Sequence, residues 1–556
     1  MNQLQLQKIV QAIVKNPPHS EAALLLSLRR EAGKFKQPSP AKSNLLAAYQ
    51  QLLKTKKIQP CPPLRKLLVK RAVRTLSGVA VITVLTKPYP CPGKCIYCPT
   101  EKGMPKSYLS NEPAAQRAFN LKFNPQKMVE LRIRALEANG HEVDKIELIV
   151  LGGTWSAYPR SYQDWFITQC FYAANTYGKK TKRRAKNLAT EQKINETAKY
   201  KIIGLTLETR PDCVTPDEVK QLRRLGCTRV QLGIQHTDDK ILKLIKRGQT
   251  LADAIAATRM LKETGFKVDH HYMPDLPTAT PAKDLKMFKY VFDSADLQPD
   301  QVKIYPCIVN QNSVLYHWYK TSRYKPYSPR QLLELLLKIK KLVPPYVRIN
   351  RLVRDIPIQS IVAGNKITNL RQYLKKLSEE QGWQCQCLNC REVRNRPSLK
   401  PKNYPAGSRD HLSTITYQAS QGTEHFLSFE SKDKKIIYAF LRLRFNDNPE
   451  KNILSELKNA ALIRELHVYG QMIPARKNQE NKKSKNQHRG FGLRLMAEAE
   501  KLARENGYKK IAVIAGIGVR NYYRKLGYQQ QGTYLIKNLA KKRSATGLPR
   551  RRKKQR

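Results

Sequence analysis

Apolar, β-branched runs alternate with amphipathic helical segments between residues 79 and 305. Thr215-Pro216-Asp217-Glu218 forms a capping box with proline at the first helical position, and the segment from Thr250 to Gly265 begins in a similar way. Six such runs with helical crossovers predict an α/β fold, a parallel (β/α)6 sheet curved into a partial barrel. The predicted strands are Val79–Thr86, Ile146–Leu151, Ile202–Leu207, Val230–Ile234, Val268–Tyr272 and Val302–Tyr305.

The pattern changes on both sides of this region. Residues 1 to about 74 are helical and basic, without a strong apolar stripe of their own, and residues 342–402 look irregular. From about residue 404, four strands (Phe426–Phe429, Ile436–Arg442, Glu465–Val468, Lys510–Ala515) and one helix (Leu493–Asn506) predict a mixed α/β domain. The chain has 556 residues, more than one core usually organises. We expect units at 1–75, 76–341, 342–403 and 404–540, and a basic tail at 541–556 that becomes ordered when bound.

The charge of the chain is strongly positive. It contains 103 Lys and Arg against 43 Asp and Glu, a net charge of +60, and residues 32–100 contain no acidic residue. A general lysine bias would spread the excess evenly, whereas this excess is local, so we expect a nucleic-acid partner. Candidate phosphate contacts in the acid-free segment are Lys66, Lys70, Arg71 and Arg74.

The hydrophobic pattern of the sequence predicts neither a membrane-spanning segment nor an export signal. No stretch approaches the roughly 18 uncharged apolar residues of a membrane span, and Met1–Lys15 is amphipathic rather than a signal core. We therefore expect a cytoplasmic protein without a membrane partner.

Cys91, Cys95 and Cys98 follow the first predicted strand with the spacing C-x3-C-x2-C. Three thiolates on one loop can bind three irons of a [4Fe-4S] cubane and leave the fourth iron open to another ligand. The alternative is a zinc knuckle, which needs a fourth ligand that is not adjacent in the sequence. The loop is expected at the carboxyl end of the barrel.

A second group, Cys385, Cys387 and Cys390, supplies three thiolates within six residues. These are too close for mutual disulfides, so we interpret them as ligands of a structural zinc ion. The fourth ligand stays open between Cys307 and several histidines, and a second iron–sulfur cluster is the minor alternative.

Glycines precede the amphipathic helix that starts near Leu493. Gly490 and Gly492 free backbone N–H groups at a helix N-terminus, where a pyrophosphate binds well. The stretch Gln487-His488-Arg489-Gly490-Phe491-Gly492 resembles the CoA-binding motif of GNAT acetyltransferases, and the preceding strand with Leu466, His467 and Val468 supports that resemblance. It implies an acetyl-CoA site, with Tyr522 or Tyr523 as proton donor to the CoA thiolate unless both pack in the core.

The first cysteine motif, with Tyr97 before its last cysteine, resembles the radical S-adenosylmethionine (SAM) superfamily. This resemblance implies SAM at the open iron. It also implies cofactor contacts at the carboxyl ends of the later strands. Glu208 is one of these candidates, and its alternative role is that of a salt-bridge partner of Arg210. The implied residues are Gly152, Gly153, Glu208, Gln231, Gln235 and Lys303.

A radical SAM barrel followed by a GNAT-like domain resembles the Elongator catalytic-subunit family of tRNA uridine-34 modifying enzymes. Matching stretches include Ile203–Asp212, Gln231–Gln235 and Arg464–Gly470. The resemblance implies that a 5′-deoxyadenosyl radical activates acetyl-CoA, which then adds to C5 of the wobble uridine and leaves carboxymethyluridine. It also implies a tRNA anticodon loop as substrate and an electron donor for the cluster, and leaves homodimers or accessory subunits open.

The chain departs from the family at Thr100, Asp275 and Thr278, which stand where relatives have glycine near the SAM pocket. Three alternative functions stay open: a protein lysine acetyltransferase with a structural cluster, another radical tRNA modification such as methylthiolation, and a non-enzymatic RNA-binding scaffold.

Overall fold

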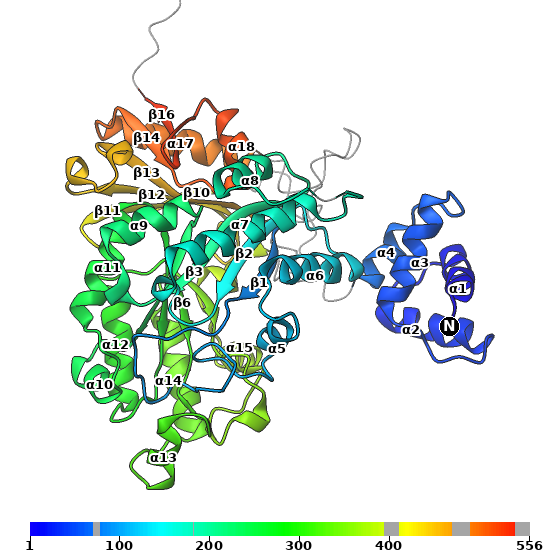
Figure 1. The fold of residues 1–556 in the computed structure, drawn as a ribbon, viewed down its shortest axis with the longest axis horizontal. Helices are drawn as coiled ribbons and strands as arrows, with labels where there is room; N and C mark the ends of the chain where they lie inside the picture. Colours follow the sequence, from blue (N-terminus) through cyan, green and yellow to red (C-terminus); the bar gives the residue numbers. More distant parts are fainter. Residues whose placement is uncertain (70–77, 182, 394–410, 470–489, 540–556) are drawn as a thin grey trace, which may run out of the picture.

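The computed structural model of the chain describes residues 1–69, 78–181, 183–393, 411–469 and 490–539. Among the helices in these ranges, none is both long and apolar enough to cross a membrane. Figure 1 shows three parts: a small helical module, a central curved sheet with its helices, and a second sheet above it.

The central sheet has seven parallel strands in sequence order, β1-β2-β3-β4-β5-β6-β8. It confirms the predicted incomplete barrel, and each of the six predicted strands is present within two residues of its expected ends. The strands are β1 (Ala80–Leu85), β2 (Lys145–Leu151), β3 (Lys201–Thr209), β4 (Arg229–Gln235), β5 (Lys267–Tyr272), β6 (Gln301–Ile304) and β8 (Arg348–Arg351).

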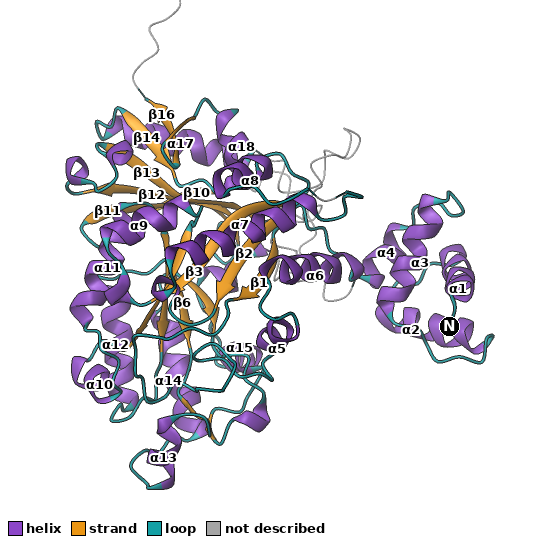
Figure 2. Cartoon of the chain, viewed as in Figure 1, coloured by secondary structure: helices purple, strands orange, loops and turns teal. Residues whose placement is uncertain are grey.

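Helices cover the outer face of this sheet (Figure 2). Thr215 and Thr250 cap two of them as predicted, each accepting a hydrogen bond from the backbone N–H three residues later. The helices of this part are α5 (Pro113–Asn120), α6 (Pro125–Ala138), α7 (Arg160–Thr176), α8 (Leu188–Asn195), α9 (Pro216–Arg224), α10 (Asp239–Leu244), α11 (Leu251–Glu263), α12 (Pro281–Asp293), α13 (Val314–Lys320) and α14 (Pro329–Leu342).

The segment that we expected to be irregular, residues 342–402, contains regular structure in its described part. Its strand β8 pairs in parallel with β6 and adds a seventh strand to the barrel. Two helices follow, α15 (Leu370–Glu380) and α16 (Leu388–Arg391), and β7 (Ile308–Val309) pairs with β9 (Ala363–Gly364). The expectation of an irregular segment was therefore wrong for residues 342–393.

The second sheet is mixed, with the order β10-β11-β12-β13-β14-β16-β15. Only β13 and β14 run parallel, and α17 (Phe491–Glu505) and α18 (Arg520–Arg524) belong to this part. The predicted strands overlap β11, β12, β13 and β14, whereas β10, β15 and β16 were not predicted. The bounds are β10 (His411–Gln418), β11 (Gly422–Glu430), β12 (Ile437–Asn446), β13 (Ala460–Val468), β14 (Lys510–Val513), β15 (Gln529–Gln531) and β16 (Tyr534–Asn538).

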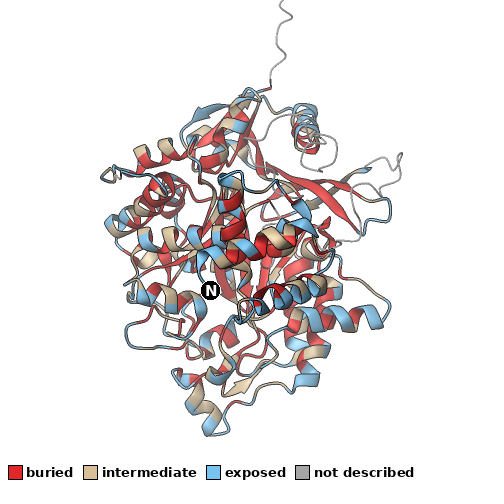
Figure 3. Ribbon diagram, turned by 90° about the vertical axis from the view of Figure 1, so that its right-hand side faces the viewer, coloured by how far each residue is buried: buried red, intermediate tan, exposed pale blue. Residues whose placement is uncertain are grey.

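The second sheet packs on the amino ends of the barrel strands. The Tyr534 hydroxyl donates to the Thr264 carbonyl (2.6 Å), and Arg464 donates to the Phe266 carbonyl (2.6 Å), both just before β5. A Cβ on Gly516 would lie 1.9 Å from the Ile203 carbonyl oxygen, so only glycine permits this approach of the two backbones. Buried residues are continuous from one sheet to the other (Figure 3).

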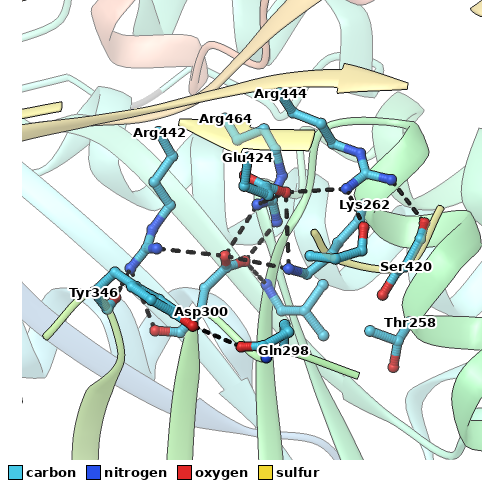
Figure 4. A network of polar contacts seen from close by, with 12 residues as sticks. Thr258, Lys262, Gln298, Asp300, Tyr346, Ser420, Glu424, Arg442, Arg444 and Arg464 are labelled. Carbon is cyan, nitrogen blue, oxygen red and sulfur yellow. Dashed lines mark hydrogen bonds and ion pairs between the residues drawn. The ribbon is translucent and has the colours of Figure 1, made fainter. Parts of the chain in front are cut away.

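A buried ionic network crosses this junction (Figure 4). Asp300, before β6, accepts from Arg464 Nη2 (2.5 Å), while Arg464 Nη1 donates to Glu424 of β11 (2.7 Å). Lys262 of α11 lies between the two carboxylates, and its burial lowers its pKa to about 8. Because these groups come from both sheets, the network fixes how the sheets sit on one another.

The amino-terminal helices form a module with its own core, which corrects the expectation that they lack an apolar stripe. The helices are α1 (Gln3–Lys15), α2 (Glu21–Gly33), α3 (Lys42–Lys54) and α4 (Pro62–Leu68). They bury Leu6, Leu24, Leu45, Tyr49 and Leu64, among others, in a cluster separate from the barrel core. Figure 1 shows the module beside the free end of α6, where Arg65 pairs with Glu142 (2.9 Å).

Candidate functional site

The first cysteine loop follows β1 and lies at the carboxyl edge of the barrel, as predicted. Ile96, in its centre, donates its N–H to the Ile245 carbonyl (3.1 Å) and accepts from the Leu315 N–H (2.9 Å). Its side chain is buried with Ile241, Leu242 and others in a separate apolar cluster. The loop is therefore anchored on two sides, which fixes the directions of the flanking cysteines.

The three sulfurs of this loop are not gathered as closely as those of the second cysteine group. A tetrahedral zinc with bonds of about 2.3 Å holds its thiolates about 3.8 Å apart. Among the described His, Cys, Asp and Glu residues, one group of three has all its ligand atoms within 4.8 Å, and it is Cys385, Cys387 and Cys390. Cys91, Cys95 and Cys98 do not form such a group, so at least one pair of their sulfurs is more than 4.8 Å apart. Burial, and then Cys95, raises the pKa of Cys98 to about 11, so metal binding must displace its proton.

Two buried arginines flank this loop. Arg247 Nη1 donates to Cys95 Sγ (3.4 Å), and its Nη2 donates to the Gly233 carbonyl (2.6 Å). Arg210 is paired with Asp212, while its buried Nη1 has no hydrogen-bond partner among the described residues. A Cβ on Gly93 would meet that Nη1 at 2.3 Å, so Gly93 lets Arg210 approach the loop. The buried guanidinium groups of Arg210 and Arg247 would stabilise a negatively charged cluster on this loop.

The glycine turn after β2 touches the cysteine loop. Gly152 has φ +148°, and a Cβ there would lie 1.9 Å from the Thr86 hydroxyl, so glycine is required. Thr154, two residues on, contacts Cys91 Sγ with its hydroxyl (3.3 Å). Gly152 lines the main cavity, which supports its predicted place beside the cofactor, whereas Gly153 is not among the lining residues.

Glu208 pairs with His271 of β5 (3.4 Å) rather than with Arg210, so its alternative role as the partner of Arg210 is not what the structure shows. Burial opposes its ionisation, but His271 and Lys303 outweigh burial and hold the pKa of Glu208 at about 2. His271 Nε2 is buried without a hydrogen-bond partner among the described residues. It is a cavity residue that the sequence analysis missed.

Gln231 of β4 and Lys303 of β6, on the two strands that flank β5, form a second polar pair. Lys303 Nζ donates to Gln231 Oε1 (2.7 Å), and burial lowers the pKa of Lys303. Gln235, at the end of β4, has φ +74° and also faces the cavity. The structure thus brings together all the predicted SAM contacts except Gly153.

The candidate acetyl-CoA residues meet at the start of α17. Gly490 caps this helix with φ +73°. A Cβ on Gly492 would lie 3.1 Å from the Tyr522 hydroxyl, 3.6 Å from Val468 and 4.0 Å from Leu466. The glycine therefore keeps a narrow gap open between the helix, β13 and Tyr522. Gln487, His488 and Arg489 lie outside the described residues.

The two candidate tyrosines differ in position. Tyr522 is 37% exposed and burial raises its pKa, whereas Tyr523 is 7% exposed and packs against Tyr522 and Tyr528. Tyr522 is thus the better placed proton donor. Phe491 packs against Phe429 in the core and does not line the cavity. His467 does line it, and its buried Nε2 has no hydrogen-bond partner among the described residues.

One cavity of about 1440 Å³ joins the two predicted cofactor sites. It runs inside the barrel from the cysteine loop at the carboxyl edge to the second sheet at the amino edge. Alternate residues of β4, β5 and β6 face inward, and several of these are polar, among them Gln231, His271 and Lys303. From the barrel it is lined by Tyr97, Gly152, Glu208, Gln231, Gln235, His271 and Lys303, and from the second sheet by Leu466, His467, Val468, Gly490, Gly492, Tyr522 and Tyr523.

The second cysteine group fits a single metal ion. Cys385 precedes α16, Cys387 is the N-cap of α16 and Cys390 lies within it. The thiols of Cys385 and Cys390 lower the pKa of Cys387. Cys307 is buried in a different cluster, so it is not part of this group. No fourth His, Cys, Asp or Glu belongs to the group within the described residues.

Of the candidate phosphate contacts, Lys66 is exposed on α4, and Lys70, Arg71 and Arg74 lie outside the described residues, as does the tail at 541–556. Three arginines that were not predicted from the sequence also line the cavity. Arg348 and Arg351 lie on β8, and Arg354 follows it.

Comparisons with known proteins agree with this geometry. Residues 89–288 match the radical SAM superfamily and residues 299–380 the radical SAM C-terminal domain. The chain is 44% identical to a tRNA uridine(34) acetyltransferase of Methanocaldococcus infernus, over 85% of this chain and 88% of that protein. It is 37% identical to human Elongator complex protein 3, over 86% and 88%. The solved structure of M. infernus Elp3 with an N-terminal deletion has a TM-score of 0.70, at 40% identity, over 83% of this chain and 99% of that one.

Proposed function

The chain belongs to the family of the tRNA uridine(34) acetyltransferases and Elongator complex protein 3, and from that premise we propose that it modifies the wobble uridine of tRNA. In this proposal it is a radical SAM acyltransferase that uses a [4Fe-4S] cluster, SAM and acetyl-CoA. The product is carboxymethyluridine, and zinc at the second cysteine group is structural.

The observation that carries the proposal is the shared cavity. The residues beside the cysteine loop and the residues around Gly492 face the same space of about 1440 Å³. A reaction that passes a reactive carbon species from one cofactor site to the other needs such an enclosed connection. A protein lysine acetyltransferase would need only the Gly492 end of the cavity.

The residues present fit the cluster and its cofactor. Cys91, Cys95 and Cys98 would hold three irons, and Glu208, Gln231 and Lys303 offer charged and polar groups to SAM. When bound, the cluster and SAM supply a 5′-deoxyadenosyl radical, which takes a hydrogen atom from the methyl group of acetyl-CoA. The product would carry this carbon fragment on C5 of uridine in place of the C5 hydrogen, with loss of one electron and one proton from the ring. Water would hydrolyse the thioester, so that CoA leaves as its thiol and the carboxymethyl group remains.

The other groups act on the substrates. The Gly490 and Gly492 backbone at the positive end of α17 would bind the CoA pyrophosphate. The Tyr522 hydroxyl, kept protonated by burial, would give its proton to the departing CoA sulfur. Arg348, Arg351 and Arg354 would contact phosphates of the anticodon loop, whose base must unstack to enter the cavity. Lys66 and the basic segment after it would hold the tRNA body.

The test is an anaerobic incubation with tRNA, labelled acetyl-CoA, SAM and a reductant, followed by nucleoside mass spectrometry. We expect label in uridine 34 from the unaltered protein and from Cys170→Ala, whose thiol is buried in α7 away from the site. Cys95→Ala should give none. Label on protein alone, or label in tRNA without SAM, would overturn the proposal.

A further inference from the structure

A second, open pocket of about 570 Å³ lies directly outside the cysteine loop. Pro92 and Lys94 of the loop form one side, and Lys243, Lys246 and Arg247 form the other. It shares no lining residue with the large cavity among the residues that the structure describes. The cysteine loop therefore separates two spaces, one for substrates and one open to solvent.

The floor of this pocket touches a cluster ligand. Arg247 lines the pocket and is 7% exposed, and its Nη1 contacts Cys95 Sγ (3.4 Å). Pro92 and Lys94 are exposed and belong to the three residues between Cys91 and Cys95. A molecule in this pocket would thus be separated from a cluster ligand by a single side chain. Because electron transfer slows steeply with distance, this face is the short route into the cluster.

The pocket is positively charged. Lys94, Lys243 and Lys246 are exposed around it and Arg247 lies below them, against the single carboxylate of Asp239 among the described lining residues. None of these lining residues is aromatic, so the pocket offers no surface on which an RNA base could stack. Charge and composition together favour an acidic protein surface over a single-stranded RNA loop.

We propose that this pocket is the docking site for an acidic one-electron carrier protein, one that holds a flavin or a small iron–sulfur centre. The proposal rests on the proposed function, since it requires a cluster at Cys91, Cys95 and Cys98. The reduced carrier loses one electron, the cluster gains it, and no atom is transferred. Because the pocket lies on the outer side of the loop, the carrier and tRNA bind at the same time.

The test measures how fast the reconstituted cluster in the full chain is reduced. The variant is Lys243→Glu/Lys246→Glu, which leaves the cysteine loop itself unchanged. The control is Lys286→Glu/Lys289→Glu, the same charge change on exposed positions of α12 that line neither pocket. Reduced flavodoxin is the probe, and photoreduced 5-deazariboflavin is the small uncharged comparison. Stopped-flow absorbance follows the cluster, and electron paramagnetic resonance verifies its content and midpoint potential.

With flavodoxin at low salt, we expect the second-order rate constant of the test variant to fall by roughly tenfold, and the difference to shrink at about 0.5 M salt. The rate with deazariboflavin and the midpoint potential should not change, and the control should match the unaltered protein. An unchanged flavodoxin rate, or an equal loss with both reductants, overturns the docking site. A loss of tRNA affinity with normal reduction would show an RNA surface instead. If the unaltered protein assembles no four-iron cluster, the proposed function fails and the docking site with it.

Discussion

The guanidinium of Arg247 donates a hydrogen bond to the sulfur of Cys95 across 3.4 Å. The same side chain also donates to the Gly233 carbonyl, and Gln249 donates to that carbonyl as well (3.1 Å). The Gly233 carbonyl therefore accepts from two side chains, Arg247 and Gln249, whereas the hydrogen bond to Cys95 Sγ comes from Arg247. Hydrogen bonds to the sulfurs and nearby charge are two of the means by which a protein sets a cluster's reduction potential.

Replacing Arg247 by methionine should make the cluster harder to reduce. A charge-assisted hydrogen bond is worth roughly 1.5–3 kcal/mol, and the reduced cluster, being more negative, gains more from it. At a fixed potential we expect the ratio of reduced to oxidised cluster to fall about tenfold, which is about 59 mV for one electron. Redox titration followed by electron paramagnetic resonance measures it. Arg259→Met, a partly exposed residue of α11 paired with Glu263, is the control and should not shift the potential.

Replacing Tyr522 by phenylalanine should slow product formation without weakening acetyl-CoA binding. Proton donation of this kind contributes typically about 10²–10⁴-fold to rate. We expect carboxymethyluridine formation to fall by about 100-fold, measured by nucleoside mass spectrometry, while the dissociation constant of acetyl-CoA from calorimetry changes less than about threefold. Tyr523→Phe, a change at the buried neighbour, should retain most of the activity. Equal losses in the two variants would assign both tyrosines a packing role.

The barrel was predictable from the sequence because its strands contain apolar, β-branched runs that alternate with capped helices. Strand β8 was not, because Arg348-Ile349-Asn350-Arg351 is mostly polar: it faces the cavity and pairs with Gln301 and Glu392. The core of the amino-terminal module was missed for a different reason. Its apolar positions, such as Leu6, Leu24 and Leu45, are divided among four short helices, so no single stripe is long.

The candidate site was predictable where motifs are local in sequence, as at the two cysteine groups and at Gly490 and Gly492. Residues that reach the site from elsewhere in the chain were missed. Arg247 reaches Cys95 only because the loop after α10 folds against the cysteine loop. His271 carried a usable signal: it stands two residues after the inward-facing Asp269, while His270 faces outward to Thr258 of α11.

Replacing Asp300 by asparagine should destabilise the junction between the two sheets. Arg464 and Lys262 would keep their charges in a buried site with one carboxylate fewer, and breaking such a pair typically costs about 3–5 kcal/mol. Urea unfolding followed by circular dichroism measures the free energy of unfolding. Asp296→Asn, an exposed change four residues earlier, should stay within about 0.5 kcal/mol of the unaltered protein. Equal stability of both variants would mean that the network does not join the sheets.

Removing the ion from the second cysteine group should loosen the segment that carries β8. We expect about one zinc per chain by mass spectrometry of the metal, and its loss in Cys387→Ser, because that sulfur is buried between the other two. Melting followed by fluorescence should then show a lower transition temperature. Cys307→Ser, a change outside the group, should retain the zinc. Full zinc content in Cys387→Ser would contradict the assignment.

The stability of the protein should fall as the pH rises toward 8, because of Asp275. This residue has φ +70° and accepts from the Tyr327 N–H (3.0 Å) beside the carboxylate of Asp284. Burial raises the pKa of Asp275 to about 8, against 3.8 for the unfolded chain. Between these two values the folded state binds the extra proton, so the free energy of unfolding decreases with pH, by up to about 1.4 kcal/mol per unit.

Asp275→Asn should remove this slope, since the amide oxygen can still accept from Tyr327 and does not titrate. Urea unfolding at pH 6, 7 and 8 gives the free energy for both proteins, and their difference isolates Asp275 because Asp284 and its neighbour His236 are unchanged. The two proteins should differ most at pH 8, where the unaltered protein has lost the contribution of the bound proton. Parallel pH profiles would show that the carboxyl group is already ionised in the folded chain. The remaining cost of Asp275 would then be confined to its left-handed backbone, and Asp275→Gly would relieve it equally at every pH.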